Sequence, residues 1–528
     1  MKDDNATKYA AESADGDDFA VVVDSDIAGN EAGTNLDKKD MWRMGKKQQL
    51  RRNFRFFSIF GFTMVLMATW EATLTANVLG LINGGTGGLI WMYIVTFFGM
   101  FIAILSMAEM ASMAPTTGGQ YHWVSEFAPA SAQKFLSYLV GWLCVLGWQV
   151  GNVAISFLVA GQLQGLIILN HASYIPERWH LTPIIIAIIT FCMAFNTFLY
   201  RQLPLVENLA LVLHVLGFFV VLIPLWAMGS PTASASDVFF TFTDGGGWGN
   251  TGLSCLVGML GPLFGFIGPD SATHMSEELR NASKSLPRAM IATMVANGAL
   301  GFVMLVSYCM LLGNVDEILA SETGQPFIQV FYNITKSKAG TSVMTVIMIV
   351  IVGCGVINNI ATSSRQLWAF ARDKGVPFSG WFSTINHKVD LPINALVFSY
   401  VFAVLLSLIN IGSLVAFNIV TSLGIGALIS SYTLSIGCMT VKRLRGQTLL
   451  PSNFKLGKAG LAINIFSVLF LFFTFIMIFF PPVPQPDLET MNWSVLVYGG
   501  VVVFSLVYYV IRGRHTYLGP VAYVRKSA

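Results

Sequence analysis

Length, composition and charge indicate an integral membrane protein. The chain has 528 residues, of which 54% are hydrophobic and only 11% are charged. Its mean hydropathy of +0.65 lies far above that of ordinary soluble domains, which excludes a soluble globular class. The net charge of +3 is small, and we expect no nucleic-acid partner.

The chain begins with a polar segment. Residues 1 to about 40 are acidic and rich in Ala, Gly and Asp, with too few large apolar side chains to build a core. We therefore expect residues 1–50 to form a disordered cytoplasmic tail. The basic run from Arg43 to Arg55 lacks the apolar core and the cleavage site of a signal peptide. We expect it to anchor the first helix and to contact anionic lipid.

Twelve apolar segments follow, each long enough to cross a bilayer as a helix. A hydrocarbon core about 30 Å thick needs about 20 mostly apolar residues per helical crossing. Strands of a membrane barrel alternate polar and apolar residues, and these segments do not. The predicted fold is an all-α polytopic membrane protein, with helices near 56–80, 89–111, 135–165, 181–199, 208–228, 253–276, 288–313, 341–371, 392–411, 413–441, 460–480 and 492–512.

The distribution of basic residues predicts the orientation. When the loops are numbered alternately from the inside, only Arg178, Lys336 and Lys338 of the 31 Lys and Arg fall on the outer side. The positive-inside rule then places both termini in the cytoplasm and supports an even number of crossings. Residues 516–528 are expected to be a short cytoplasmic tail.

The sequence contains no pattern typical of a metal or cofactor site. All six cysteines fall within predicted membrane helices and lack metal-type CxxC spacing, so we interpret them as buried apolar thiols. His274 and Glu278 are four residues apart, but no HExxH motif or second cluster completes a coordination sphere. We expect no metal and no cofactor.

Carboxylates inside the predicted helices are candidates for function. A charged group at the bilayer centre costs about 2.5–3.5 kcal/mol on insertion scales, so such residues mark binding or proton sites by default. Glu71 lies midway through the first helix, and Asp270 lies in the sixth. Glu109 and Glu207 lie nearer to helix ends, where pairing with Arg or Lys is the more ordinary explanation.

The sixth helix carries a predicted break. Gly265, Gly268 and Pro269 lower helix propensity and remove a backbone donor, which frees backbone groups to bind a ligand. The first helix carries no Gly or Pro around Glu71, so its break is less marked. Interrupted helices in matching positions of two repeats are the best sequence pointer to a transporter's substrate site. The alternative is a simple kink beside a buried, hydrogen-bonded acid.

Two other groups of titratable residues are candidates for function. His214 lies on an apolar face of the fifth helix, where a histidine is usually a satisfied core residue, although its ordinary titration range suits reversible protonation. Glu277 and Glu278 are expected at the cytoplasmic mouth as part of an inner gate. Their expected partners are Arg280, Lys284 or Arg288.

Three stretches in order carry a family resemblance. Residues Glu109 to Pro129 (EMASMAPTTGGQYHWVSEFAP), Gly265 to Met290 and Arg365 to Pro377 (RQLWAFARDKGVP) resemble signatures of the amino acid–polyamine–organocation superfamily. TWEA in the first helix, the extended tail and the stretch from Phe480 to Gly500 resemble its fungal amino acid/choline transporter branch. The resemblance covers about residues 50 to 515.

The resemblance implies a LeuT-like fold within residues 51–515. Two five-helix repeats of inverted topology, about 56–228 and 253–441, would be followed by two further helices, about 460–512. Substrate would bind to the broken helices one and six and to helix three, at Ala68, Thr69, Trp70, Glu71, Gly265, Phe266, Ile267, Gly268, Trp148 and Asn152. Further polar contacts are expected from Gln149, Asn358 and Asn359.

The resemblance also implies a coupling mechanism. Asp270 stands at an acidic position after the helix-six break, and His214 stands where several members carry a coupling lysine. We expect the two residues to exchange a proton as the site opens alternately outward and inward, with helices one and six moving against helices three and eight.

The expected function is secondary active transport of a small amino acid or a related amine or choline-like compound. Relatives in this branch carry 4-aminobutyrate, choline and other amino acids, and no residue chooses among them. The expected partners are this substrate, protons and the lipid bilayer of the plasma membrane. Alternatives are an exporter of an amine-type specialised metabolite and a non-transporting nutrient sensor, which would bind ligand without accumulating it. An enzyme is not expected, because no nucleophile and base are arranged together.

Overall fold

The fold is a bundle of membrane-spanning helices. The computed structural model describes residues 11–13, 20–22, 33–386, 390–413 and 415–520. Within these residues, twelve helical segments are long and apolar enough to cross a membrane, which confirms the predicted all-α polytopic fold. In chain order the spans are Phe56–Thr75, Val78–Met113, Gln133–Asn170, Arg178–Phe198, Tyr200–Met228, Thr251–His274, Ala282–Leu311, Lys338–Arg372, Ile393–Gly412, Ala416–Leu444, Gly457–Met477 and Ser494–Thr516.

Half of the spans are single helical elements and half join shorter elements. Span two kinks at Gly85, whose backbone is not helical, with φ of 66°. Spans two, three, four, seven, eight and ten are α4 (Val78–Met113), α6 (Gln133–Asn170), α7 (Arg178–Phe198), α13 (Ala282–Leu311), α16 (Lys338–Arg372) and α20 (Ala416–Leu444). Spans one and six are broken, into α2 (Phe56–Met67) and α3 (Thr69–Thr75), and into α10 (Thr251–Val257), α11 (Leu260–Phe266) and α12 (Ser271–His274). These two spans open the two expected repeats.

The remaining spans contain only end irregularities. They are a 3₁₀ turn (Tyr200–Gln202) with α8 (Leu203–Met228), α18 (Ile393–Ser407) with α19 (Ile409–Gly412), a 3₁₀ turn (Gly457–Ala459) with α21 (Gly460–Met477), and α22 (Ser494–Tyr508) with a π-helical turn (Tyr509–Gly513) and α23 (Arg514–Thr516). Helical spans suit a bilayer because every backbone hydrogen bond is made within the segment.

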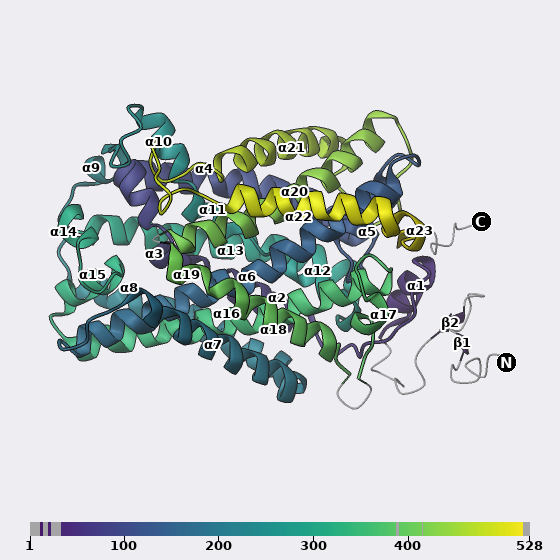
Figure 1. Ribbon diagram of the computed structural model, residues 1–528, viewed down its shortest axis with the longest axis horizontal. Helices are drawn as coiled ribbons and strands as arrows, with labels where there is room; N and C mark the ends of the chain where they lie inside the picture. The colour runs from purple at the N-terminus through teal and green to yellow at the C-terminus, as the bar shows by residue number, and fades with distance from the viewer. Residues whose placement is uncertain (1–10, 14–19, 23–32, 387–389, 414, 521–528) are drawn as a thin grey trace.

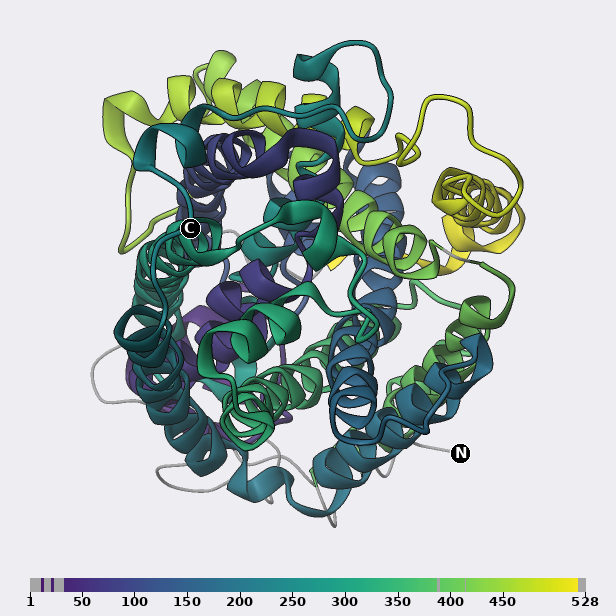
Figure 2. The same cartoon turned by 90° about the vertical axis from the view of Figure 1, so that its left-hand side faces the viewer.

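The short elements gather at the two ends of the bundle (Figure 1). One end, here the α1 end, carries α1 (Asn35–Arg43), α5 (Gln120–Phe127), a 3₁₀ turn (Ser276–Glu278) and α17 (Ser379–Phe382). The other end, here the α15 end, carries α9 (Ala235–Phe240), α14 (Val315–Leu319) and α15 (Pro326–Thr335). Figure 2 looks along the bundle from the α15 end and shows the helices packed around a central region.

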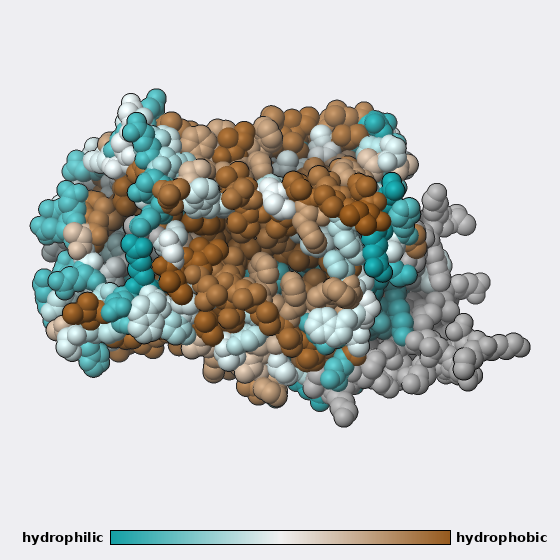
Figure 3. Space-filling view, viewed as in Figure 1, coloured by the Kyte–Doolittle hydropathy of each residue, from teal (hydrophilic) through white to brown (hydrophobic). Residues whose placement is uncertain are grey.

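Burial and surface hydropathy agree with membrane insertion. Spans one and three are almost wholly buried, whereas span twelve is largely exposed at the edge of the bundle. Hydrophobic residues form a broad band across the middle of the molecule, and hydrophilic residues gather at both ends (Figure 3). This exposed apolar band is the surface that lipid would cover.

Part of the segment expected to be an N-terminal tail is folded. Two short antiparallel strands, β1 (Ala11–Ser13) and β2 (Ala20–Val22), precede α1, and the rest of residues 1–32 lies outside the described residues. The carboxylate of Asp37 accepts hydrogen bonds from the backbone N–H groups of Asn281 and Ala282, at 2.9 and 3.0 Å. Because the start of a helix leaves such donors free, α1 is fixed to the first residues of α13.

The basic run after α1 contacts protein. Arg52 lies 3.3 Å from the Asp37 carboxylate, Lys46 forms an ion pair with Asp373, and Arg43 donates to the backbone oxygen of Met113. These protein contacts were not expected from the sequence, and the lipid contact of this run stays a prediction. At the other end of the chain, Tyr517 is buried, and residues 521–528 lie outside the described part.

Candidate functional site

The first span breaks at Ala68. This residue adopts a left-handed conformation, with φ of 40° and ψ of 50°, between α2 and α3. A left-handed backbone costs a residue with a Cβ about 1–2 kcal/mol. The Thr69 hydroxyl donates to the backbone oxygen of Gly265 at 2.7 Å. Tertiary contacts between the two broken spans thus accompany a break that no Gly or Pro encodes.

The sixth span breaks where the sequence predicts it. α11 ends at Phe266, Ile267 is extended, and Gly268 has φ of 117°. A Cβ added at Gly268 would lie 2.5 Å from Cδ2 of Leu66, so both backbone conformation and close packing require glycine. α12 then begins at Ser271, directly after Asp270.

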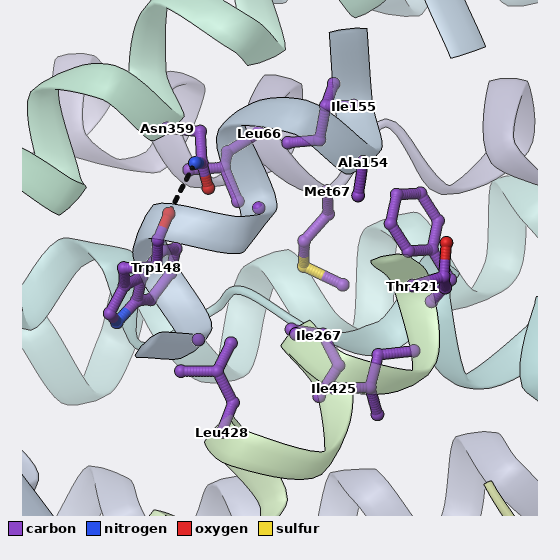
Figure 4. A pocket seen from close by; sticks show the side chains of 14 residues that line it. Leu66, Met67, Trp148, Ala154, Ile155, Ile267, Asn359, Thr421, Ile425 and Leu428 are labelled. Carbon is purple, nitrogen blue, oxygen red and sulfur yellow. Dashed lines mark hydrogen bonds between the residues drawn. The ribbon is translucent and has the colours of Figure 1, made fainter. Parts of the chain in front are cut away.

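A cavity of about 50 Å³ lies between the two breaks (Figure 4). Leu66 and Met67 line it from span one, and Phe264 and Ile267 line it from span six. Helices α6, α16 and α20 complete the wall with Trp148, Asn359 and Thr421 among their contributions. No residue of the lining carries a charge.

Few polar groups reach this apolar cavity. The Thr421 hydroxyl and the Trp148 indole N–H are buried and have no hydrogen-bond partner among the described residues. The Asn359 amide donates to the backbone oxygen of Trp148 at 3.1 Å and to Oδ1 of Asn152 at 2.7 Å. Because buried polar groups are normally hydrogen-bonded, the Thr421 hydroxyl is available to a bound molecule.

Beside the break, a second set of contacts joins spans one, five and seven. The ring of His214 on α8 lies with Nδ1 2.9 Å from Oε1 of Glu71 and with Nε2 3.0 Å from Oδ1 of Asn297. The Asn297 amide nitrogen donates to the backbone oxygen of Met64 at 3.0 Å, which fixes the orientation of this amide. All three polar side chains are fully buried.

Asp270 belongs to a separate network. Its two carboxylate oxygens accept hydrogen bonds from the Gln120 amide at 2.6 Å and the Tyr432 hydroxyl at 2.5 Å. His274 lies nearby, with Nε2 4.0 Å from the same carboxylate, while its Nδ1 donates to the backbone oxygen of Thr117 at 2.9 Å. Asp270 therefore fixes α12 to α5 and α20.

Asp270 and His214, which the sequence predicts to exchange a proton, share no hydrogen-bond partner among the described residues. The side chains that contact Asp270 come from α5, α12 and α20, and those that contact His214 come from α3 and α13. The carboxylate that contacts His214 is Glu71. Sequence spacing gives no information on such partners, because Glu71 and His214 are 143 residues apart.

Aromatic side chains close the cavity toward the α15 end. Phe417 lies 6.1 Å from Phe264 and 6.2 Å from Phe157, measured between ring centroids. Above this layer, a wider cavity of about 420 Å³ opens, lined by Thr75, Gln325 and Asn418 among others. The aromatic layer thus separates the small central cavity from an open vestibule.

Ion pairs close the α1 end. Arg372 donates two hydrogen bonds to Glu277, at 2.9 and 2.6 Å, and Arg365 donates one to Glu278 at 2.9 Å. Both arginines come from α16, which replaces the predicted partners Arg280, Lys284 or Arg288. The Glu109 carboxylate pairs with Arg443, as expected for an acid near a helix end.

At the α1 end, positive charges lower the pKa of two buried acids more than burial raises it. Burial raises the pKa of the Glu277 carboxyl, but the Arg372 guanidinium and the positive charges of Lys46 and Arg52 hold this pKa below its usual value. Burial likewise raises the pKa of Asp373, and Lys46 and Arg372 reverse that effect. Both acids are therefore ionised at neutral pH.

The architecture of two broken spans around a small cavity agrees with a comparison of the sequence with known proteins. The amino acid permease profile matches residues 54–502, which is most of the chain. The chain belongs to the amino acid permease family. This permease is thus a membrane transporter and not an enzyme.

Similar proteins extend over almost the whole permease. A putative amino acid/polyamine transporter of Macrophomina phaseolina is 30% identical over 439 residues, which cover 83% of this chain and 96% of the relative. The choline transporter of Saccharomyces cerevisiae is 28% identical over 482 residues, 91% and 85% of the two chains. Amino-acid permease 2 of Neurospora crassa is 26% identical over 504 residues, 93% and 90%.

The permease places only some of the predicted binding residues at its cavity. Trp148 and Ile267 line it, and Ala68 and Gly268 form the adjacent breaks. The others have different contacts. Gly265 accepts the Thr69 hydrogen bond, Phe266 packs on Tyr93 and Phe97, Asn152 supports Asn359, and Glu71 contacts His214.

Trp70 does not line the central cavity of the permease. Its indole N–H donates to the backbone oxygen of His214 at 3.3 Å, and its ring packs 6.0 Å from that of Phe218. The Trp70 ring is thus directed at α8.

Sequence reasoning missed several residues of the permease site. Thr421 gives little signal, because a threonine in an apolar helix usually bonds to its own backbone. Asn297 was detectable in principle, since an amide in the middle of a membrane helix is costly without a partner. Gln120 and Tyr432 gain their role only through contact with Asp270.

Proposed function

We propose that this permease is a proton-coupled secondary active importer of a small zwitterionic amino acid, working by alternating access in the plasma membrane. The observation that carries the proposal is the double contact of His214 with Glu71 and Asn297. It lies directly beside the break in span one, whose preceding residues line the cavity.

These contacts need an exchangeable proton. Oδ1 of Asn297 can only accept, so Nε2 of His214 must donate to it. A neutral imidazole has one N–H, and its Nδ1 then faces Glu71 with a lone pair. Both contacts therefore require either a doubly protonated His214 beside an ionised Glu71, or a protonated Glu71 beside a neutral His214. Loss of one proton removes one contact.

The loss of one of these contacts on deprotonation can couple proton release to a change of conformation. Glu71 belongs to α3, His214 to α8 and Asn297 to α13, so deprotonation would weaken the attachment of the broken span to its neighbours. Such a change biases one conformation over another, which is how a bound proton can drive a transport step. Asp270, with two donors on its carboxylate, serves to position α12.

The cavity supports a zwitterionic substrate. Burying a net charge without a partner is costly, and the lining offers neither a carboxylate nor a basic group. An amino acid carries opposite charges that backbone groups at the two breaks can meet. One water-sized group needs roughly 10–15 Å³ on this scale, so a cavity of about 50 Å³ favours a short side chain, with its polar group near Thr421.

Orientation follows the distribution of charge. The basic residues outside the three exceptions, Arg178, Lys336 and Lys338, lie at inner positions of the predicted topology. The positive-inside rule then supports a cytoplasmic α1 end carrying both termini.

Competitive uptake into proteoliposomes tests the proposal. Radiolabelled alanine would be the probe, competed by a panel of amino acids, 4-aminobutyrate, choline and polyamines, under an imposed pH or sodium gradient. We expect uptake driven by the pH gradient and inhibited most strongly by small neutral amino acids. Uptake driven by sodium alone, or inhibited by choline in preference to every amino acid, would overturn it.

A further inference from the structure

α8 carries a second buried acid that the proposed mechanism does not use. The carboxyl of Glu207 is fully buried, and its Oε2 accepts a hydrogen bond from the Asn358 amide at 2.9 Å. Its Oε1 has no hydrogen-bond partner among the described residues. The Arg or Lys expected to pair with Glu207 is not among its contacts. A buried carboxyl without a cation is stable mainly in its protonated form.

Glu207 lies on the same face of α8 as His214. Seven residues separate the two, which corresponds to two helical turns and about 10.5 Å along the axis. Ala210 and His214 lie on this buried face with Glu207. Glu207 lies nearer than His214 to the start of α8. Arg201, which precedes this start, pairs with Asp390 at the α1 end.

Two asparagines connect these groups to α2, one accepting from His214 and the other donating to Glu207. Asn297 contacts His214 and donates to the backbone oxygen of Met64, while Asn358 contacts Glu207 and donates to the backbone oxygen of Phe62. The two backbone oxygens are two residues apart on the half of span one that ends at the break. A movement of α2 would therefore disturb both titratable groups together.

Few other titratable groups face Glu207. α2 contains none in its sequence, and Gly61 of α2 packs against the backbone of Glu207 so closely that an added Cβ would lie 2.8 Å from its oxygen. On α16, the Cys354 thiol lies close enough to the Glu207 carboxyl for the two groups to interact electrostatically. On α8 itself the other titratable group of this face is His214.

We propose that Glu207 is a second proton station, which receives the proton released by the Glu71–His214 pair and passes it to the α1 end. The proposal rests on the proton coupling proposed above. Glu207 first gives its own proton to water at the α1 end and is then reprotonated from His214. One proton enters the pair and one leaves Glu207 in each cycle, and no electrons move. Chains of buried Glu and His serve as proton relays in other membrane proteins.

The test compares Glu207→Gln with wild type in proteoliposomes. Glutamine can accept the Asn358 hydrogen bond but cannot release a proton. Net alanine uptake driven by a pH gradient should fall at least about tenfold, as when a proton-transfer group is lost. Exchange of internal for external alanine, which needs no net proton movement, should fall by less than about twofold. Cys354→Ala, which alters the neighbouring side chain, is the matched control and should keep both activities.

The outcomes separate this inference from the proposed function. If wild type moves no protons with alanine, the proposed coupling itself fails. If wild type does so and Glu207→Gln retains full pH-driven uptake, Glu207 is not a proton station. If Glu207→Gln loses exchange as well, Glu207→Asp decides. Recovery of pH-driven uptake by Asp supports the relay, and equal impairment by Gln and Asp would show that the residue only packs.

Discussion

Nδ1 of His214 lies 2.9 Å from Oε1 of Glu71, inside a bundle where both side chains are fully buried. The same ring also contacts Asn297, whose amide orientation is set by the backbone of Met64. Both contacts of the His214 ring can form only when the Glu71–His214 pair holds one proton more than an ionised Glu71 and a neutral His214 together. Span one therefore carries, beside its break, a site that can bind and release a proton.

Replacing His214 by lysine should keep coupling and move its pH range. A lysine ammonium can donate to both Glu71 and Asn297. Free lysine titrates near pH 10.4 and free histidine near 6.5, so the proton should be held to higher pH. We expect alanine uptake by His214→Lys to decline at least about one pH unit higher than wild type.

His214→Ala is the control for this substitution, and the readout is uptake into proteoliposomes across pH 5 to 9. Alanine uptake by His214→Ala should lose its pH dependence altogether. If the lysine and alanine variants behave alike, His214 contributes only packing.

Replacing Asp270 by asparagine should affect stability more than coupling. An asparagine side chain has one oxygen in place of two, so it loses either the Tyr432 or the Gln120 hydrogen bond. This should lower the free energy of unfolding by about 1–3 kcal/mol. The pH profile of the remaining uptake should keep the shape of wild type.

Thermal unfolding in detergent and uptake across pH measure the two effects of Asp270→Asn. Tyr432→Phe removes one of the same hydrogen bonds without changing the acid and should resemble it. If uptake by Asp270→Asn no longer depends on pH while uptake by Tyr432→Phe keeps the wild-type pH profile, Asp270 takes part in proton coupling.

Adding a methyl group at Gly268 should disrupt the break in span six. The new Cβ would lie 2.5 Å from Leu66, and the φ of 117° is unfavourable for any residue but glycine. We expect Gly268→Ala to lose about 1–3 kcal/mol of stability, as for other overpacked sites, and to lose most uptake.

Gly353→Ala is the matched control, because a Cβ at this position of α16 meets no atom within 4 Å. It should retain stability and transport. Normal unfolding and uptake by Gly268→Ala would mean that the break does not depend on this glycine.

Acid pH should weaken the ion pairs at the α1 end and lower Tm, whereas neutral pH should not. The pKa of Glu277 and of Asp373 is lowered in the folded protein, from ordinary values of 4.5 and 3.8. Groups with lowered folded pKa values contribute stability above the unfolded values and lose it as pH falls through the folded ones. Tm in detergent should therefore change little from pH 8 to 5 on account of these acids, and fall below about pH 4.

Glu277→Gln should show a lower Tm at neutral pH, because the partly buried Arg372 guanidinium loses the carboxylate with which it pairs. Its further loss of Tm in acid should be smaller than that of wild type. An acid loss of Tm that is as large in Glu277→Gln as in wild type would remove Glu277 as its source.

The sequence predicted the fold far better than it predicted the contacts of the site. Apolar length alone identified all twelve spans, because a bilayer imposes one minimum length on every crossing. Gly268 and Pro269 marked the break in span six through their own backbone limits. The break at Ala68 has no such marker, since its left-handed conformation is held by tertiary contacts.

Contacts between distant residues were the part that could not be predicted. The apolar pattern of α8 showed that His214 faces the interior, but not that Glu71 and Asn297 lie on either side of it. Glu207 was expected near a cation because it lies close to a helix end, and the structure instead surrounds it with α2 and α16. Such pairings depend on how helices pack, which local sequence does not encode.

The most direct test of the central claim is the proton flux that accompanies alanine transport, measured with a pH-sensitive dye trapped in proteoliposomes. Wild type should change the internal pH when alanine enters without an imposed gradient. Glu71→Gln should still exchange alanine but move no protons, because a glutamine amide can donate to His214 and satisfy the same contacts without an exchangeable proton. Equal proton movement in the two proteins, or none in wild type, would contradict the account.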